Sequence, residues 1–421
     1  MGLTMKEKQA LADVTGPRYR KANKDGKSRI LDEFCLGTGY HRKYAIALLK
    51  NAGKTQVKRI GNKMVKVKIT ARTRKKRLYK RFYDEQVEKV VLDIWAFFRC
   101  ICGKRLVPLI RDNLDAIAES SRFRRSITDK TKTKLARISR STVERMLGQE
   151  RKRRKTKGTS ATKSGTLLKQ QIAVRTFWRW DDKQPGFCEI DTVSHDGGYA
   201  AGEYLFTLSA TDVCLCWSEF RALKNKARTW TEKALEDIRV GFPVPVKGID
   251  SDNGAEFINW HLKHWCERHS ITFTRGRQYH KNDNAFVEQK NGDVIRKTIG
   301  YGRFQGDDAL EALTQVYAVL NPLNNFFYPN LKCIDKKQLS NRTRRIYEKV
   351  PKTPFHRAME RDDISAELKQ RLIQQKSSMN IVELQDDLDR ALDNLQRFIQ
   401  HAPGGIDRLE STFPDSSLVR I

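Results

Sequence analysis

Hydrophobic positions in the second half of the chain are spaced as they are in a mixed α/β domain. Apolar runs of strand length lie at residues 187–193, 204–213 and 217–223, and the short turns between them predict an antiparallel meander. Further apolar runs then alternate with helical spacing. The expected helices are 230–240, 258–269, 284–299 and 308–320, and the expected strands are 244–250 and 271–274. This order predicts an α/β fold with a mixed five-stranded sheet and flanking helices.

The first half of the chain has the periodicity of helices instead. Two short helices flank Gly37-Thr38-Gly39, as in a helix-turn-helix, although a generic helical hairpin would have the same pattern. Residues 84–147 again show apolar helical faces, whose aromatic residues are expected in a core and not as a stacking platform for bases. The segment 136–143 predicts the start of a second helix-turn-helix, with Ser139 or Ser141 as the N-cap.

The C-terminal region combines mixed and helical patterns. Residues 366–400 are expected to form one long helix, because their apolar residues recur at intervals of three and four. Such a seam either pairs with another protomer or packs on its own domain, and the pattern leaves both open. The tail from Pro403 is expected to be disordered.

These changes of pattern divide the chain into six expected segments. They are a helix-turn-helix-like region (1–53), a basic arm (54–83), a helical DNA-binding domain (84–148), a basic flexible linker (149–180), an α/β core (181–325) and a C-terminal region with a heptad-patterned helix and a disordered tail (326–421). Within the basic arm, Val65, Val67 and Ile69 predict one short strand.

Charge is distributed very unevenly between the two halves. Residues 1–180 contain 48 Lys and Arg against 15 Asp and Glu, whereas residues 181–421 contain 34 against 35. A strongly cationic half joined to a neutral half is typical of a nucleic-acid-binding protein. The candidate DNA contacts are basic groups that open the second helix or lie in the basic arm and linker. They are His41, Arg42, Lys43, Arg74, Lys75, Lys76, Arg151, Arg153 and Arg154.

Cysteine usage and hydropathy argue against several other classes of protein. The eight cysteines lack the spacing of a zinc knuckle, so reduced thiols of a cytosolic protein are expected. The most apolar stretch, residues 90–102, is too short for a membrane span and contains Asp93 and Arg99. Residues 1–8 contain no apolar segment, so no signal peptide is expected.

Three carboxylates lie at the ends of predicted strands or on the helix that follows. Asp191 is in the first strand, Asp252 precedes an Asn-Gly turn, and Glu288 lies 36 positions after Asp252 with 35 residues between them. Carboxylates that converge at one sheet edge repel one another unless cations lie between them, and ligation by oxygen alone suits Mg²⁺ or Mn²⁺. Two such ions can hold the attacking and leaving oxygens of an in-line phosphoryl transfer.

Neighbouring carboxylates compete for these roles. Asp250 is two residues before Asp252, so on a strand both side chains point to the same face. Glu189 and Asp196 flank Asp191, but Asp191 has the position after the apolar residue Ile190. Asp250 is expected to support the site or cap a helix.

The segments FCEIDTV, SDNGAEF and NDNAFVEQKN resemble the catalytic core of the retroviral integrase and DDE transposase superfamily. The resemblance includes the D, D-35-E spacing and the RNase H-like strand order, and it covers residues 185–325. KTPFHRAME at 352–360 is similar to a segment that follows the core in bacterial insertion-sequence transposases. The resemblance implies metal ligation by Asp191, Asp252 and Glu288, DNA strand transfer, and a multimeric synaptic complex.

The resemblance also implies DNA contacts close to these carboxylates. In this superfamily a loop before the glutamate helix touches the DNA end, which makes Arg277, Tyr279 and Lys281 candidates, and Lys290 is a candidate on the helix itself. Many relatives carry a basic residue seven positions after the glutamate, where this chain has Ile295. The sequence also lacks the His-His-Cys-Cys zinc module of retroviral relatives, which favours a bacterial mobile element.

These features predict a transposase that cleaves and joins DNA with two Mg²⁺ or Mn²⁺ ions. It would bind double-stranded DNA at element ends and target, act as a homo-multimer, and work at the nucleoid in a bacterial cytoplasm. Two alternatives stay open. One is an inactive or domesticated transposase that regulates by sequence-specific DNA binding, and the other is a nuclease that cuts without joining.

Overall fold

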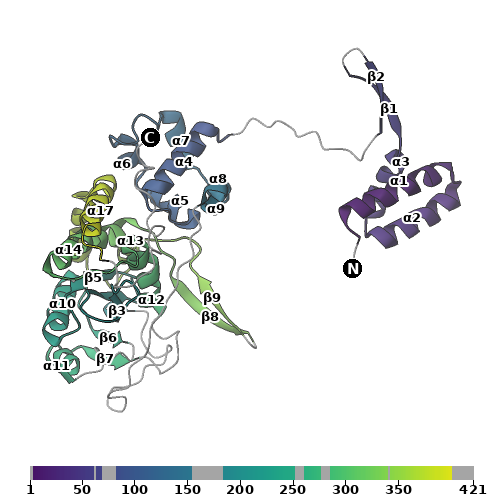
Figure 1. Cartoon of the computed structure of the whole chain (residues 1–421). Coiled ribbons are helices and arrows are strands. Elements are labelled where there is room, and N and C mark those ends of the chain that lie inside the picture. The colour runs from purple at the N-terminus through teal and green to yellow at the C-terminus, as the bar shows by residue number, and fades with distance from the viewer. Residues whose placement is uncertain are drawn as a thin grey trace. The chain divides into compact units, whose positions relative to one another are not determined.

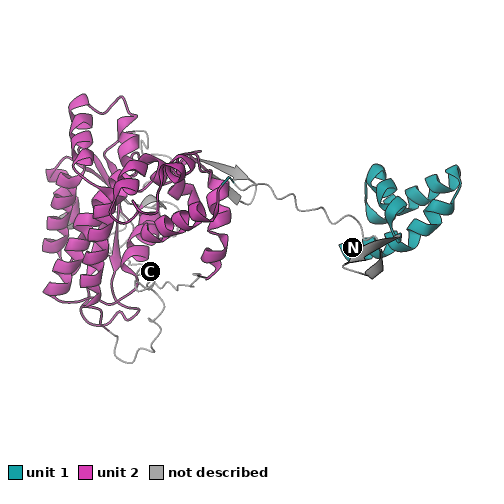
Figure 2. Ribbon diagram, turned by 90° about the horizontal axis from the view of Figure 1, so that it is seen from above, with its two compact units in different colours: residues 1–82 teal, residues 83–421 magenta. Residues whose placement is uncertain are grey.

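The structure, a computed structural model, divides into two units, residues 1–82 and residues 83–421 (Figure 1 and Figure 2). It describes residues 3–60, 63–68, 82–153, 184–251, 260–275, 285–339 and 342–400. Each unit has a hydrophobic core of its own.

Unit 1 begins with the all-α region expected from the sequence. Its helices are α1 (Met5–Lys21), α2 (Lys24–Thr38) and α3 (Arg42–Asn51). Gly39 ends α2 in the left-handed conformation with φ of 68°, which glycine adopts without strain, and His41 caps the start of α3. The turn therefore lies slightly later than the predicted one, and the assignment as a helix-turn-helix stays a prediction.

The first helix of this region, α1, is not expected from the hydrophobic pattern. It begins at a capping box in which Thr4 and Glu7 bond to each other's backbone N–H groups. Small residues form much of its buried face, and a Cβ added at Gly16 would lie 2.9 Å from the carbonyl oxygen of Ala52. Pro17 lies inside the helix, where proline removes a hydrogen bond. A helix that packs through small residues and contains proline has little sequence signature.

Part of the basic arm forms a hairpin instead of the single short strand that the pattern predicts. Strands β1 (Thr55–Ile60) and β2 (Lys63–Lys68) pair antiparallel, with Thr55 opposite Lys68. Residues 69–81, which include Ile69, lie outside the described residues.

Unit 2 begins with the helices expected for residues 84–148. They are α4 (Glu85–Phe97), α5 (Gly103–Asp112), α6 (Leu114–Glu119), α7 (Asp129–Ala136), α8 (Arg140–Met146) and α9 (Gly148–Arg153). The Ser139 hydroxyl accepts from the Thr142 N–H at 3.2 Å, which confirms Ser139 as the N-cap of α8. Trp95, Phe97 and Phe98 are buried, so the aromatic residues are core residues as expected.

The predicted five-stranded mixed sheet is present. Its strands are β3 (Phe187–Ser194), β4 (Phe206–Asp212), β5 (Ser218–Leu223), β6 (Gly248–Ser251) and β7 (Thr272–Arg275), in the spatial order β5-β4-β3-β6-β7. The first three pair antiparallel as a meander, whereas β6 pairs parallel with β3 and β7 parallel with β6. This strand order is the one that the resemblance to integrase cores implies.

Helices pack around this sheet. They are α10 (Arg228–Gly241), α11 (Trp260–Arg268), α12 (Ala285–Lys290), the π-helix η1 (Asn291–Arg296), α13 (Lys297–Ile299), α14 (Asp307–Pro322) and the π-helix η2 (Leu323–Phe327). α12 packs on β3 and β4, whereas α10 and α14 pack on β5. The helix expected at 284–299 is thus one helical segment whose middle is a π-helix.

The C-terminal region differs from the prediction of one long helix. It contains the hairpin β8 (Cys333–Leu339) and β9 (Arg342–Tyr347), followed by α15 (Pro354–Met359), α16 (Ala366–Ser377) and α17 (Ile381–Gln396). The single helix over 366–400 is wrong, because the chain leaves the helix after Ser377 and Asn380 caps a new one. The apolar face of α17 packs on α14, so the seam is used within its own unit.

One hydrophobic cluster runs through all parts of unit 2. Buried side chains of α4, β3, α14 and α17 belong to it together. Arg105 of α5 also donates to the carbonyl oxygen of Pro329 at 2.6 Å, and the rings of Phe98 and Tyr328 meet edge to face. The helices of residues 84–153 are therefore part of unit 2, and their role in DNA binding stays a prediction.

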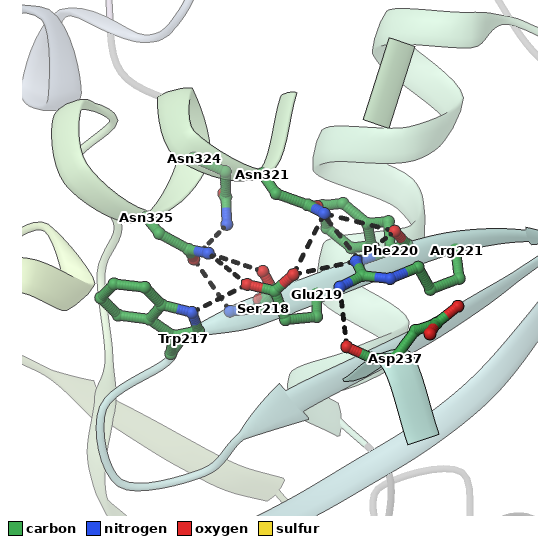
Figure 3. Close-up of polar contacts among 9 residues, drawn as sticks. All are labelled: Trp217, Ser218, Glu219, Phe220, Arg221, Asp237, Asn321, Asn324 and Asn325. Carbon is green, nitrogen blue, oxygen red and sulfur yellow. Dashed lines mark hydrogen bonds and ion pairs between the residues drawn. The ribbon is translucent and has the colours of Figure 1, made fainter. Parts of the chain in front are cut away.

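Two asparagine amides cover the outer edge of strand β5, the edge that does not pair with β4 (Figure 3). Asn325 accepts from the N–H of Ser218 at 2.9 Å and donates to its carbonyl oxygen at 2.8 Å. Asn321 forms the same pair of bonds with Phe220, at 3.1 and 3.3 Å. An edge strand with unpaired backbone groups can pair with another chain, and these amides satisfy the groups that β4 does not reach.

All eight cysteines are free thiols, and Cys102 is the exposed one. Among the described residues, no helix combines the length and the apolar character needed to cross a membrane.

Candidate active site

Strand β3 presents two carboxylates to helix α12. Glu189 and Asp191 are two residues apart, so their side chains leave the strand on the same face. The sequence pattern predicts Asp191 at the end of a strand, but β3 continues to Ser194. Asp191 lies opposite Ser209 of β4, whereas the described pairing of β3 with β6 ends at Ile190.

Glu189 anchors the beginning of α12 to the sheet. Its side chain is fully buried, and Oε2 accepts from the backbone N–H of Val287 at 3.1 Å. The N–H groups of a first helical turn have no partner within the helix, and the positive end of the helix favours a carboxylate there. We therefore assign Glu189 to positioning helix α12 and not to metal ligation.

Asp191 is held in one orientation by two hydrogen bonds. Its Oδ2 accepts from Nδ2 of Asn291 at 2.7 Å, and its Oδ1 accepts from the backbone N–H of Thr192 at 2.7 Å. Asn291 is buried, and its own Oδ1 accepts from the hydroxyl of Ser209 at 2.6 Å. Asp191 itself is only partly buried.

Glu288 lies between the two residues that attach α12 to β3. Val287 bonds to Glu189 and Asn291 bonds to Asp191, so this face of the helix is turned toward the strand. Glu288 is three positions before Asn291 and hence about 60° around the helix from it. Its side chain is exposed. The structure therefore brings the helix that carries Glu288 against the strand that carries Asp191.

Asp252 lies outside the described residues, which end at Ser251 in this part of the chain. Ser251 is the last residue of β6 and is in parallel register with Ile190. Asp250 is fully buried and accepts from the Thr274 hydroxyl of β7 at 2.5 Å. Asp250 thus links β6 to β7, and its expected role in supporting the site or capping a helix stays a prediction.

The described residues contain no set of three or more His, Cys, Asp or Glu side chains that could hold a metal ion. Two of the three proposed ligands, Asp191 and Glu288, are among the described residues, and Asp252 is not. The described donors of the site are carboxylate oxygens, a set that suits a hard divalent cation.

Lys290 is placed differently from its expected role as a DNA contact. It is buried at 7% exposure, and its Nζ donates to Oδ1 of Asn324 at 3.0 Å. Burial lowers the pKa of Lys290 to about 7, and the positive charges of Arg105 and Arg357 contribute to this shift. An ammonium enclosed in this way does not face solvent, so we do not retain Lys290 as a DNA contact.

The other described basic candidates are on the surface or in ion pairs. Lys43 is exposed, and His41 Nδ1 accepts from the Lys43 backbone N–H at 3.3 Å. Arg42 is paired with Asp32. Arg151 pairs with Glu144 and Arg153 lies 3.8 Å from Glu150. The remaining candidates lie outside the described residues, namely Arg74, Lys75, Lys76, Arg154, Arg277, Tyr279 and Lys281.

Sequence reasoning misses Asn291 and Ser209 as parts of this site. Asn291 is the last residue of the NDNAFVEQKN segment and lies one helical turn after Val287, so its position on the sheet-facing side could have been noticed. Ser209 carries no such signal, because its link to Asn291 joins residues 82 positions apart.

Comparison with known proteins gives one relative and two structural matches of interest. No protein-family model matches the chain. The uncharacterized protein y4rM of Sinorhizobium fredii (strain NBRC 101917 / NGR234) is 32% identical over 352 residues, covering 83% of this chain and 95% of that protein. The catalytic core of BIV integrase matches with a TM-score of 0.25 and 13% identity, over 34% of this chain and 86% of that one. The HTLV-2 integrase catalytic core in complex with magnesium matches with a TM-score of 0.26 and 16% identity, over 38% and 93%.

Proposed function

The chain belongs to the family of the uncharacterized Sinorhizobium fredii protein y4rM, and from its site we propose that it is a metal-dependent DNA transposase. The proposed reaction is cleavage of DNA at the ends of a mobile element and transfer of the freed strand to target DNA. Asp191, Asp252 and Glu288 are the proposed catalytic carboxylates.

The observation that carries this proposal is the parallel register of β3 and β6. Ile190 lies opposite Ser251, and the next residue in each strand direction is Asp191 on one side and Asp252 on the other. Neighbouring strands are about 4.8 Å apart, so the described end of β6, from which the chain continues to Asp252, lies beside the strand that carries Asp191. The helical segment that carries Glu288 is attached to β3 through Val287 of α12 and Asn291 of η1, which supports Glu288 as the third carboxylate.

These side chains fit a divalent cation. Three carboxylates that converge would need positive charge between them, and oxygen donors select Mg²⁺ or Mn²⁺. Asp191, Asp252 and Glu288 would hold a pair of such ions, which would supply activation of the attacking hydroxyl and stabilisation of the leaving oxygen of an in-line displacement. The protein's own contribution is positional, because Glu189 holds the start of α12 and Asn291 holds Asp191. No covalent protein nucleophile is required.

The distribution of charge supports double-stranded DNA as the substrate. Residues 1–82, which form unit 1, contain 24 Lys and Arg against 5 Asp and Glu. A transposase needs such a module to bind element ends, because its catalytic carboxylates by themselves repel phosphates. We extend the proposal to a homo-multimer, since two element ends must be cut and joined together.

The proposal is tested with a plasmid that carries the coding region and its flanking DNA. The full-length protein and Mg²⁺ are expected to nick this plasmid at defined positions and to join the ends to a second duplex. Nicking without joining would favour the nuclease alternative, and binding without nicking would favour a DNA-binding regulator. Cleavage that persists in EDTA would contradict the metal-dependent mechanism.

Unit 1 is expected to bind duplex DNA by itself. Six or more neutralised phosphates give a log–log slope of affinity against salt of about −5 or steeper, measurable by fluorescence anisotropy with residues 1–82. A fragment that ends at residue 180 is unsuitable, because it would separate α4–α9 from the core of unit 2.

A pair of charge reversals tests whether α3 faces the DNA. Lys43→Glu at the start of α3 and Lys6→Glu on α1 change the net charge equally, and both residues are exposed. We expect Lys43→Glu to weaken binding at least tenfold more than Lys6→Glu, because a helix-turn-helix directs the first residues of its second helix to the DNA. Equal effects would indicate diffuse electrostatic binding and would remove the helix-turn-helix assignment.

A further inference from the structure

Asn291 connects the central strand β3 and its neighbour β4 through a single amide group. Its Nδ2 donates to Oδ2 of Asp191 on β3 at 2.7 Å, and its Oδ1 accepts from the hydroxyl of Ser209 on β4 at 2.6 Å. The same hydroxyl lies 3.2 Å from the backbone oxygen of Asp191. Ser209 and Asp191 are themselves opposite each other in the β3–β4 register. Asp191, Asn291 and Ser209 are therefore joined in a relay of hydrogen bonds, from the Ser209 hydroxyl through the Asn291 amide to the Asp191 carboxylate.

The chemistry of the three groups sets the direction of this relay. An ionised carboxylate only accepts hydrogen bonds, so the amide must turn its NH₂ toward Asp191 and its oxygen toward Ser209. Ser209 can donate to that oxygen and is fully buried, so no solvent competes for its hydroxyl. The amide is thus fixed in the one orientation that donates to Asp191.

The helix is irregular at the residue that makes this contact. Asn291 is the first residue of the π-helix η1, which separates α12 from α13. π-helical turns are rare and occur frequently at functional sites. Two residues of this helical segment bond to acidic side chains of β3. Val287 donates its backbone N–H to Glu189, and Asn291 donates its side-chain amide to Asp191.

We propose that Asn291, oriented by Ser209, is a positioning residue that holds the Asp191 carboxylate in the rotamer needed to bind a divalent cation. The inference rests on the proposed function, because it assumes that Asp191 is a metal ligand. Without the amide, the Asp191 carboxylate keeps the hydrogen bond from the Thr192 N–H but loses the bond to Oδ2, so it is less restricted and metal binding must restrict it further. Partners of metal ligands that act in this way change metal affinity by about 10- to 100-fold when removed.

The test measures metal binding directly, without DNA or turnover. The loss of the free Mn²⁺ signal in electron paramagnetic resonance is titrated with the full-length protein and its variants. Asn291→Ala is expected to weaken Mn²⁺ binding by about 10- to 100-fold. Ser209→Ala, which leaves Asn291 in place, is expected to weaken it by about 2- to 10-fold. The double variant is expected to match Asn291→Ala, because both residues act through one amide.

A matched control and a second readout separate positioning from simple stability. Gln289→Ala shortens an exposed side chain of the same helix and is expected to leave Mn²⁺ affinity unchanged. The Mg²⁺ concentration at half-maximal nicking is expected to rise for Asn291→Ala by the same factor as the Mn²⁺ dissociation constant, with recovery at saturating Mg²⁺. If Asn291→Ala does not fold by circular dichroism, Ser209→Ala carries the same comparison with a smaller change.

Two outcomes overturn the inference in distinguishable ways. If Asp191→Asn abolishes Mn²⁺ binding but Asn291→Ala and Ser209→Ala leave the affinity unchanged, the relay is only structural and the positioning role is excluded. If Asp191→Asn also leaves Mn²⁺ binding unchanged, Asp191 is not a ligand, and the proposed function fails together with the inference.

Discussion

Conversion of Asp191, Asp252 or Glu288 to the corresponding amide is expected to lower Mg²⁺-dependent nicking by about 10³-fold or more. An amide keeps the shape of the side chain but removes the negative charge that holds a hard cation. Metal ions contribute several kcal/mol of charge stabilisation to phosphoryl transfer, and each 1.36 kcal/mol is a factor of ten in rate. DNA binding through unit 1 is expected to remain close to that of the wild type, as measured by anisotropy.

A carboxylate close to the site provides the control for these three variants. Asp293 lies on the helical segment that follows Glu288 and forms an ion pair with Lys297. Asp293→Asn therefore removes the same charge nearby without touching a proposed ligand, and we expect a rate within a few-fold of the wild type. Full joining activity in any of the three ligand variants, or an equal loss in Asp293→Asn, would show that the site is assigned incorrectly.

The sheet and the location of the carboxylates follow from local patterns that a sequence displays. The strands of the meander are apolar runs separated by short turns, and their order limits the possible sheets to a few. Asp191 is predictable as a candidate because it follows an apolar run, and Glu288 because of its spacing from Asp252. These signals depend on neighbouring residues in the chain.

Features that depend on distant contacts are not predictable in this way. The bond between Asn291 and Asp191 joins residues 100 positions apart, and hydrophobic periodicity has no information about it. Lys290 has the composition of a surface cation, yet the packing of α12 on the sheet buries it beside Asn324. The break after Ser377 is missed because the apolar spacing continues across it, although Asn380 is a good N-cap.

Glu219→Ala is expected to destabilise unit 2 by about 3–5 kcal/mol, a large share of the stability of an ordinary domain. The Glu219 carboxyl group is at 6% exposure in the cluster of Figure 3. It accepts from Trp217 Nε1 at 3.0 Å, from Arg221 Nη1 at 2.9 Å and from the amides of Asn321 and Asn325 at 3.1 and 3.3 Å. Removing this acceptor leaves four donors, one of them charged, without their shared partner in a buried site.

The loss of folding free energy is expected to be larger for a variant in the buried Glu219 cluster than for a variant in a surface ion pair. Burial raises the pKa of Glu219 above its ordinary value, against the opposing effect of Arg221, so the carboxyl group is costly to bury and stays only because its donors surround it. Glu219→Gln keeps one acceptor oxygen and is expected to cost about 1.5–3 kcal/mol. Glu232→Ala, which breaks the surface pair with Arg228 on α10, is expected to cost at most about 1 kcal/mol. Urea denaturation followed by circular dichroism measures the stability of all three variants. Equal denaturation midpoints for Glu219→Ala and Glu232→Ala would mean that the asparagine amides hold the β5 edge without the carboxylate.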